Sequence, residues 1–265
     1  MKRFKGYAIP YFVWLVLFVV VPLFVMLILT FLQINAMDFS TASFSFDSYF
    51  RLADPSILKA LWNSLVVAVS TVVICLLLGY PTYFLSFSKL KNKKLVLLLM
   101  ILPMWSNSML RIVSWLRLFS TDFFAAMNLL GSTGAVIAVT VTTYLPFMIF
   151  PIYTILEKLD RSCLEASRDL GVNAFKTFFK VTLPLSMEGV SSGVLMVFLP
   201  AATGFAISQT IGQGRVRLVG NLIQSVFEKN NYSFGSLLSL FVSVVILALV
   251  FVLTKIQSRK RGVAC

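Results

Sequence analysis

The chain has 265 residues, of which 58% are hydrophobic and 12% are charged, and its mean hydropathy is +0.91. A soluble domain of this length needs far more polar surface, so the composition places the chain in a membrane. The net charge of +13 would suggest nucleic-acid binding in a soluble protein. Here the basic residues lie in short connections between apolar segments, where they orient a membrane protein, and we expect no nucleic-acid partner.

Residue types that carry enzyme or metal chemistry are scarce. Cys75, Cys163 and Cys265 lie far apart and form no CxxC pair, so neither a disulfide framework nor a zinc site is expected. Histidine, the commonest general base and metal ligand, is absent. We therefore predict no catalytic residue and no metal site in this chain.

The apolar segments predict an all-α integral membrane protein. A bilayer core of about 30 Å needs about 20 apolar residues in a helix. Six spans are expected, near residues 7–32, 61–87, 95–119, 135–156, 189–211 and 234–256. The first is longer than the apolar part of a signal peptide and has no cleavage site after it, so it is expected to remain uncleaved. The connection 120–134 is semi-apolar and is compatible with a short interfacial helix.

The basic residues predict the orientation of these spans. With the N-terminus inside, 16 of the 23 Lys and Arg residues fall on the inner side and seven on the outer side. This bias agrees with the positive-inside rule at every connection. Both termini and the loop 157–184 are then expected to face the cytoplasm.

The third predicted span is the most polar one. Five of its residues follow helical spacing along one face after a kink at Pro103: Met104, Asn107, Ser108, Arg111 and Trp115. A polar stripe in lipid faces a pathway or another helix, and both alternatives stay open. Trp105, Asn107 and Ser108 are therefore candidates for lining a pathway. Arg111 is expected near the outer interface, in a structural or gating role, where it can snorkel or pair with an acid such as Asp122.

The fourth and fifth spans add further candidates. Tyr144 offers an aromatic face that suits a cation, although ordinary packing is the commoner use of such rings. In the fifth span, Pro200 and Gly204 permit a bend, and we assign them a structural or gating role. Thr203 is a further candidate for lining a cavity; tight packing is the alternative.

The loop 157–184 has the pattern of two short helices. Ser162 and Glu165 fit a capping box that opens a helix over 164–170, and Gly171 suits the left-handed position that ends it. Asn173 can cap a second helix, which Pro184 is expected to stop. In that helix the side chains at 175, 178, 179 and 182 share one mostly aromatic face. Such a face is buried against the protein's own helix ends, the lipid headgroups or a partner.

The spacing of this loop resembles the EAA signature of ABC importer permeases. The matching residues are Glu165-Ala166-Ser167, then Gly171 after three intervening residues, then Val181-x-Leu183-Pro184 after nine more. Ser167 and Val181 depart from the usual Ala and Ile. In that family the loop docks in a groove on the ATPase subunit. The resemblance therefore implies an ATPase-coupling role for Glu165, Ala166, Ser167, Asp169, Gly171, Phe175, Phe178, Phe179, Leu183 and Pro184.

The likeness narrows to the spermidine/putrescine branch of the type I importer permeases. It is carried by WNSLVVAVSTVVICLLLGYPTYFLS, LPMWSNSMLRIVSWL and LPFMIFPIYTILEKLD. It implies one permease domain over 1–265 in a bacterial inner or plasma membrane. It also implies a second, non-identical permease subunit, two ATPase subunits and an extracellular polyamine-binding protein. The outer connection 120–134 looks shorter than is usual for the family.

ATP chemistry and substrate selection are expected to lie largely outside this chain. No Walker A phosphate cradle is present, so ATP and Mg²⁺ are expected on the partner ATPase subunits. None of the ten acidic residues lies clearly at the middle of the membrane, so the polyamine assignment comes from the resemblance alone. The alternative is the same architecture importing thiamine, another organic cation, or an anion such as sulfate or molybdate.

Rival classes of function lack their usual signs. A secondary transporter normally has a membrane-embedded acid or an internal repeat, and an intramembrane enzyme needs a nucleophile and base or metal ligands. We find none of these in the sequence. The acids Asp38, Asp47 and Asp54 of the first outer loop either help to dock the binding protein or lie in a solvated loop.

Overall fold

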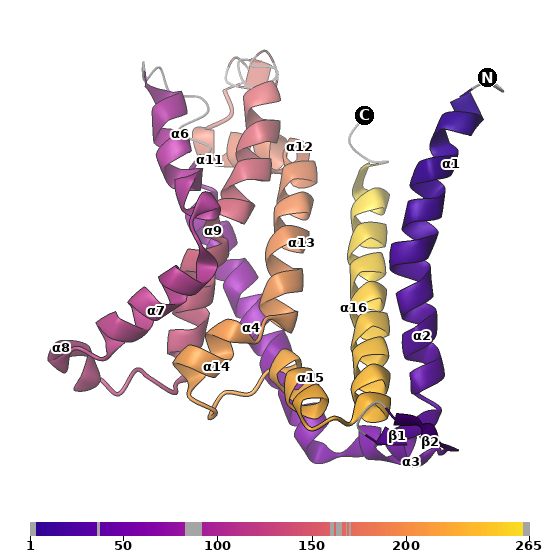
Figure 1. The fold of residues 1–265 in the computed structure, drawn as a ribbon. Helices are drawn as coiled ribbons and strands as arrows, with labels where there is room; N and C mark the ends of the chain where they lie inside the picture. The colour runs from indigo at the N-terminus through magenta and orange to yellow at the C-terminus, as the bar shows by residue number, and fades with distance from the viewer. Residues whose placement is uncertain are drawn as a thin grey trace. The chain divides into compact units, whose positions relative to one another are not determined.

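The structure is a computed structural model that describes residues 4–35, 38–82, 92–159, 162, 166, 167, 169 and 171–261. Most of these residues are helical (Figure 1). The chain divides into two compact units. The first comprises residues 1–59 and 222–247, and the second comprises residues 60–221 and 248–265.

The first unit begins with one apolar helical run. It consists of α1 (Phe4–Leu15), a π-helical stretch η1 (Val16–Val20) and α2 (Val21–Leu29). A short antiparallel hairpin of β1 (Leu32–Asn35) and β2 (Asp38–Phe44) follows, then α3 (Asp47–Phe50) and η2 (Arg51–Ala53). The start of α16 (Tyr232–Arg261) completes the unit.

The hairpin is a departure from the purely α-helical prediction. It is stabilised by aromatic packing, in which Phe31 stacks on Phe44 at 5.9 Å and on Tyr49 at 5.7 Å between ring centroids. Ring pairs of this kind add to the free energy gained by burying their area. No periodic pattern in the sequence predicts that rings of β2 and α3 pack together.

The second unit is built around one long helix, α9 (Thr133–Lys158). It also contains α4 (Pro55–Gly79) from residue 60, α6 (Lys93–Ile101), η3 (Leu102–Trp105), α7 (Ser108–Phe119), α8 (Asp122–Ala125), α13 (Met187–Thr203), α14 (Ala206–Gly212) and the start of α15 (Val219–Glu228). α13, α14 and α6 all pack on α9. The short helix expected in 120–134 is present as the single turn α8, whereas α15 was not predicted.

Close approach of α13 to α9 depends on two glycines four residues apart. A Cβ atom at Gly189 would lie 2.7 Å from the backbone oxygen of Pro151, and one at Gly193 would lie 2.7 Å from Sδ of Met148. Small residues let helix backbones come this close in membrane proteins. Gly189 and Gly193 therefore have a packing role at this helix contact.

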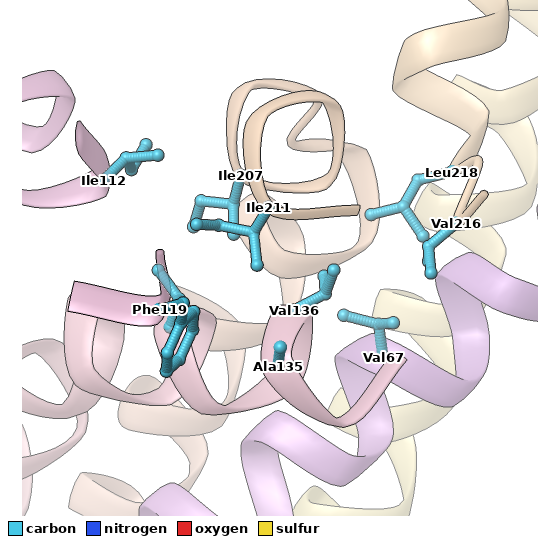
Figure 2. Close-up of a cluster of buried hydrophobic side chains, with 10 residues drawn as sticks. Val67, Ile112, Phe119, Ala135, Val136, Ile207, Ile211, Val216 and Leu218 are labelled. Atoms are coloured by element: carbon cyan, nitrogen blue, oxygen red, sulfur yellow. The ribbon is translucent and has the colours of Figure 1, made fainter. Parts of the chain in front are cut away.

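The apolar core of the second unit gathers side chains from four helices and a loop. Figure 2 shows one cluster, in which Val136 of α9 lies between Val67 of α4 and Ile207 and Ile211 of α14. Leu218, which precedes α15, belongs to the same cluster. This core holds the ends of α7, α9 and α14 together, next to the cavity described below.

Four helices of the described residues are long and apolar enough to cross a membrane, and two bent helix pairs would raise the number to six. The four lie at Pro10–Leu29, Pro55–Gly79, Thr133–Lys158 and Tyr232–Phe251. The bent pairs are Lys93–Trp105 with Ser108–Phe119, at 91°, and Phe175–Leu185 with Met187–Thr203, at 68°.

The predicted span 95–119 is therefore not one continuous helix. α6 ends at Ile101, Pro103 sits in the 3-10 turn η3, and Ser106 and Asn107 have extended backbone angles. Proline lacks the backbone N–H that a continuing helix would use. The expectation of one polar face from Met104 to Trp115 is wrong for this reason, because the stripe is divided between two helices nearly at right angles.

The predicted span 189–211 is likewise interrupted. α13 ends at Thr203, Gly204 is extended with φ −62° and ψ 135°, and α14 begins at Ala206. The interruption follows Pro200 by one turn, which is where the predicted bend lay.

In the first unit's connection to α4, Oδ1 of Asp54 accepts a 2.8 Å hydrogen bond from the backbone N–H of Ser56. That bond, with a second from the Ser56 side chain, lowers the pKa of Asp54 and identifies this acid as a helix cap.

Candidate functional site

The first candidate site is the helical loop, which we define as residues 162–185. The described residues of its first helix are Ser162, Ala166, Ser167 and Asp169, and all four are helical. Gly171 ends this helix with φ +72°, as predicted. The backbone N–H of Val172 donates to the backbone oxygen of Ser167 at 3.2 Å, which is the six-to-one bond of a Schellman motif. Glu165 and its predicted capping role lie outside the described residues.

The second helix of the loop begins as the sequence predicts and ends differently. Oδ1 of Asn173 accepts a 2.9 Å hydrogen bond from the backbone N–H of Lys176, which confirms the predicted cap. The helix runs through α11 (Ala174–Thr177), a π-helical stretch η4 (Phe178–Thr182) and α12 (Leu183–Leu185). It does not stop at Pro184, and the 68° bend comes just after Leu185.

The π-helical stretch has a local cause in Pro184. The backbone N–H of Leu183 donates to the oxygen of Phe178, five residues earlier. A proline inside a regular α-helix would collide with the carbonyl four residues before it and leave that carbonyl unpaired. A wider π turn just before the proline relieves this clash, and such turns are common at functional sites.

The predicted aromatic face divides into a buried half and an exposed half. Thr182 is fully buried, and the Phe178 ring packs edge-to-face on Tyr80 at 5.0 Å and 79°. By contrast, Phe175 is 72% exposed and Phe179 is 49% exposed, with their ring centroids 4.8 Å apart. Phe179 still contacts Phe178 edge-to-face at 5.1 Å, but it lies on the outer side of that ring. Two adjacent rings are thus left outside the fold of this chain.

The two helices of the loop are joined by a buried polar contact. The hydroxyl groups of Ser167 and Thr177 lie 2.9 Å apart, and both residues are buried. Ser167 is the position at which this chain departs from the Ala of the EAA signature. Among the other predicted coupling residues, Ala166, Asp169 and Pro184 are exposed and Leu183 is half-buried.

Tyr80 is a residue of this site that sequence reasoning missed. It follows the last residue of α4, and its hydroxyl hydrogen-bonds the hydroxyl of Ser186 at the 68° bend. Ser186 is fully buried. No spacing rule links two residues so far apart, and the only hint in the sequence was a tyrosine inside Gly-Tyr-Pro at the end of an apolar segment.

The second candidate site is a cavity of about 160 Å³ beside the helix breaks. Its lining includes four of the predicted residues, namely Ser108, Tyr144, Pro200 and Gly204. The remaining lining comes from α7, α9, α13, α14 and the loop before α15: Ile112, Thr140, Thr143, Ala201, Phe205, Ala206, Ile207 and Leu218. The cavity thus opens where α13 ends and where α7 begins.

The cavity lining is largely apolar. The hydroxyls of Thr140 and Thr143 donate to the backbone oxygens of Val136 and Val139 in their own helix, at 2.6 and 2.7 Å. No acidic or basic side chain is among the lining residues. Such a space suits an aliphatic segment or a small weakly polar group.

Three predicted pathway residues lie elsewhere. Trp105 is 78% exposed, and Oδ1 of Asn107 accepts a 2.8 Å hydrogen bond from the backbone N–H of Met109 as the cap of α7. The Thr203 hydroxyl donates to the backbone oxygen of Leu199 at 2.9 Å. The structure therefore brings Ser108 and Tyr144 together at the cavity, and it does not bring these three there.

Arg111 binds backbone oxygens at the break between α6 and α7. Its guanidinium donates to the oxygen of Pro103 at 2.6 Å, to that of Ser106 at 3.3 Å and to that of Thr143 in α9 at 3.3 Å. Asp122 is not among the partners found within the described residues. A helix break frees carbonyl groups, and a guanidinium is well suited to bind several at once.

The described residues contain no group of three or more His, Cys, Asp or Glu side chains that could hold a metal ion. The two sites are therefore an exposed aromatic pair on a helical loop and an apolar cavity between broken helices.

Comparison with known proteins gives a consistent family. Residues 5–261 match the family described as the binding-protein-dependent transport system inner membrane component. The chain is 39% identical over 256 residues to the spermidine/putrescine transport system permease protein PotB of Haemophilus influenzae, covering 91% of this chain and 89% of the relative. It is 35% identical to the Escherichia coli protein of the same name, covering 88% of this chain and 90% of the relative.

Solved structures share the fold at low sequence identity. A bacterial ABC transporter that imports the acidic polysaccharide alginate matches with a TM-score of 0.73 and 14% identity, covering 97% of this chain and 96% of the other. The alginate transporter in complex with its pentasaccharide-bound periplasmic protein matches with a TM-score of 0.76 and 14% identity, covering 97% and 94%. These matches establish the type I ABC permease fold.

Proposed function

Because the chain belongs to the family of binding-protein-dependent transport system inner membrane components, we propose that it forms the translocation pathway for spermidine and putrescine in an ABC importer. The observation that carries the proposal is the 39% identity, over 91% of the chain, to a permease named for spermidine/putrescine transport. The chain is a transport subunit and not an enzyme. Its energy comes from partner ATPase subunits, and its solute from an external binding protein.

The assembly that we propose contains four kinds of subunit. This chain pairs with a PotC-like second permease, two PotA-like ATPase subunits bind ATP and Mg²⁺, and a PotD-like protein delivers the polyamine. The complex lies in a bacterial inner or plasma membrane, with six spans and with both termini in the cytoplasm. The distribution of 16 against seven basic residues supports this orientation.

The helical loop provides the contact to the ATPase in this proposal. Phe175 and Phe179 are exposed on its outer face, and two adjacent phenylalanine rings in water favour burial in a partner's groove. ATP closes the ATPase pair, which displaces the docked loop. α13 follows because only Ser186 separates it from α12. Nucleotide shifts the permease to the extent that it favours one arrangement over the other.

The cavity beside the helix breaks is the part of the pathway supplied by this chain. Its apolar lining suits the methylene segments of a polyamine, whereas ammonium groups need carboxylates from the second permease. A free cationic side chain near the outer mouth, such as Arg111, would favour the anion alternative. In the structure its guanidinium binds three backbone oxygens, so it no longer favours an anion site.

The substrate is tested with the reconstituted complex in liposomes. Uptake of labelled spermidine and putrescine is measured with the loaded binding protein outside and Mg-ATP inside, beside thiamine, sulfate and molybdate. We expect uptake and stimulated ATP hydrolysis with polyamines only. Stimulation by thiamine or an anion, with none by either polyamine, would replace the proposed substrate.

The docking role is tested with matched phenylalanine substitutions. Phe179→Asp places a charge in the proposed groove, and Phe123→Asp introduces the same charge at an exposed ring of α8. We expect Phe179→Asp to lose the ATPase subunits during purification and Phe123→Asp to retain them. Equal retention in both variants would refute docking through this face.

A further inference from the structure

A continuous series of ring contacts leads from the exposed face of the helical loop to a buried helix joint. Phe175 contacts Phe179 at 4.8 Å, and Phe179 contacts Phe178 edge-to-face at 5.1 Å and 86°. Phe178 in turn contacts Tyr80 edge-to-face at 5.0 Å and 79°. The Tyr80 hydroxyl then hydrogen-bonds the hydroxyl of Ser186. We call these five residues the aromatic relay.

The inner end of the relay lies at the point where the loop turns into α13. Ser186 is the only residue between α12 and α13, and the two helical segments meet there at 68°. The Ser186 hydroxyl also donates to the backbone oxygen of Leu183 at 3.1 Å. The Ser186 backbone N–H donates to the backbone oxygen of Thr182 at 2.9 Å. A change of angle between the two segments would therefore alter the hydrogen bonds of the Ser186 hydroxyl.

Tyr80 connects that joint to a different helix. Its backbone N–H donates to the oxygen of Leu76 at 2.9 Å, so the residue extends the last turn of α4. α4 is the second candidate span, whereas the loop is connected covalently to the ends of α9 and α13. Tyr80 therefore gives α4 a direct contact with both the second helix of the loop and the joint.

The geometry of these contacts suits the transfer of a displacement. Edge-to-face ring pairs have a preferred orientation, and packed side chains shift between discrete arrangements instead of deforming smoothly. A push on the exposed pair Phe175 and Phe179 thus moves the Phe178 ring, and the Phe178 ring moves Tyr80. The hydrogen bond between the Tyr80 and Ser186 hydroxyls also depends on direction, because a hydrogen bond breaks when its partners are misaligned.

We propose that Tyr80 is a positioning residue that transmits movement of the docked loop to α4 and to the start of α13. The second span then moves together with the fifth when ATP closes the ATPase pair. The proposal rests on the proposed function, since it assumes that a partner ATPase occupies the exposed face of the loop. It assigns to the end of α4 a role that loop docking alone does not require.

The test uses the complete complex in liposomes with the loaded binding protein. Tyr80→Phe keeps the ring and its contact with Phe178 but removes the hydroxyl, and Ser186→Ala removes the other half of the bond. The measured quantity is solute imported per ATP hydrolysed, together with complex yield and thermal stability. Tyr153→Phe is the control, because it removes a tyrosine hydroxyl, bonded to Glu157 at 3.4 Å, from α9 and outside the relay.

We expect Tyr80→Phe to lower import per ATP about two- to tenfold, which corresponds to the loss of one hydrogen bond. Ser186→Ala should have a similar effect, and the double variant should be no worse than either single one, because both remove the same contact. Tyr153→Phe should stay at the parent value. A purely structural role would lower yield or stability and leave import per ATP unchanged.

Three results would overturn the relay: unchanged import per ATP in Tyr80→Phe, fully additive effects in the double variant, or an equal decrease in Tyr153→Phe. Should either hydroxyl variant fail to assemble, Phe178→Leu tests the same relay one step earlier, and import per ATP equal to the parent would refute it. Failure of the proposed substrate gives a different result. In that case polyamines do not stimulate the parent complex, whereas Tyr80→Phe still lowers import per ATP of whichever of thiamine, sulfate or molybdate stimulates it.

Discussion

Replacing Gly171 by alanine isolates the energetic role of the turn inside the helical loop. Gly171 has φ +72°, in the left-handed region, and a Cβ atom built on it would meet no atom within 4 Å. The cost of the substitution is therefore conformational and contains no steric clash. For an L-residue in this region the cost is about 1–2 kcal/mol. This corresponds to a factor of about 5–30 in the population of correctly turned loops.

Two other glycines provide matched controls for this substitution. Gly214 has φ +74° and also has no atom within 4 Å of a Cβ, so alanine there carries the same strain. It lies between α14 and α15, beyond the far end of α13 from the loop. Gly134, in the first turn of α9, is equally open and has no positive φ, so alanine there is unstrained.

The assay combines thermal unfolding of the purified complex with import per ATP in liposomes. We expect Gly171→Ala and Gly214→Ala to lower the unfolding midpoint by similar amounts, and Gly134→Ala to leave it unchanged. Only Gly171→Ala should lower import per ATP. Gly171→Asn should recover most of the loss, because asparagine tolerates the left-handed region. Gly171→Ala with parental coupling, or Gly214→Ala with an equal coupling defect, would show that the turn has no specific role.

The remaining predictions concern the polar link in the loop, the helix break and the helix contact. Ser167→Ala should destabilise the protein by about 1–3 kcal/mol, because it leaves the buried Thr177 hydroxyl unpaired. The double variant Ser167→Ala with Thr177→Val should lose less stability, because it removes both hydroxyls. Chemical denaturation that ranks the two variants in the reverse order would refute this contact. Arg111→Lys loses the multiple bonding at the α6–α7 break and should lower the unfolding midpoint with unchanged solute preference; altered preference in uptake competition would contradict the structural role. Gly193→Leu should force α13 from α9 and cost about 1–3 kcal/mol, and an unfolding midpoint equal to that of the parent would show that the two helices are not in close contact.

The features that sequence predicted well are those determined by a few neighbouring residues. The left-handed Gly171 and the Asn173 cap depend on the backbone preferences of one residue and on bonds that reach five residues or fewer. The apolar segments are equally local, since the length of a span follows from the thickness of the bilayer. These properties, together with the EAA spacing, indicated the family before any contact was known.

Other features were decided by tertiary structure. The polar stripe of the third span was predicted on one helix face, yet a 91° break divides it, and Arg111 of the second half binds the oxygens of Pro103 and Ser106. The aromatic face was predicted as a unit, yet Phe178 packs on Tyr80 whereas Phe175 and Phe179 stay exposed, and a π turn replaces the helix end predicted at Pro184. In both cases proline was visible in the sequence, but whether it kinks, breaks or widens a helix depends on what receives the freed carbonyl groups.

The sequence by itself thus determined the membrane class, the apolar segments, the turn at Gly171 and the identity of the family, because each depends on residues close together in the chain. Only the tertiary structure decided which rings stay exposed, which residues line the cavity, and that Tyr80 hydrogen-bonds Ser186, 106 residues away. The physical reason is one of range. Backbone preference and hydropathy act within a few residues, whereas a packing contact depends on the placement of every helix between its two partners.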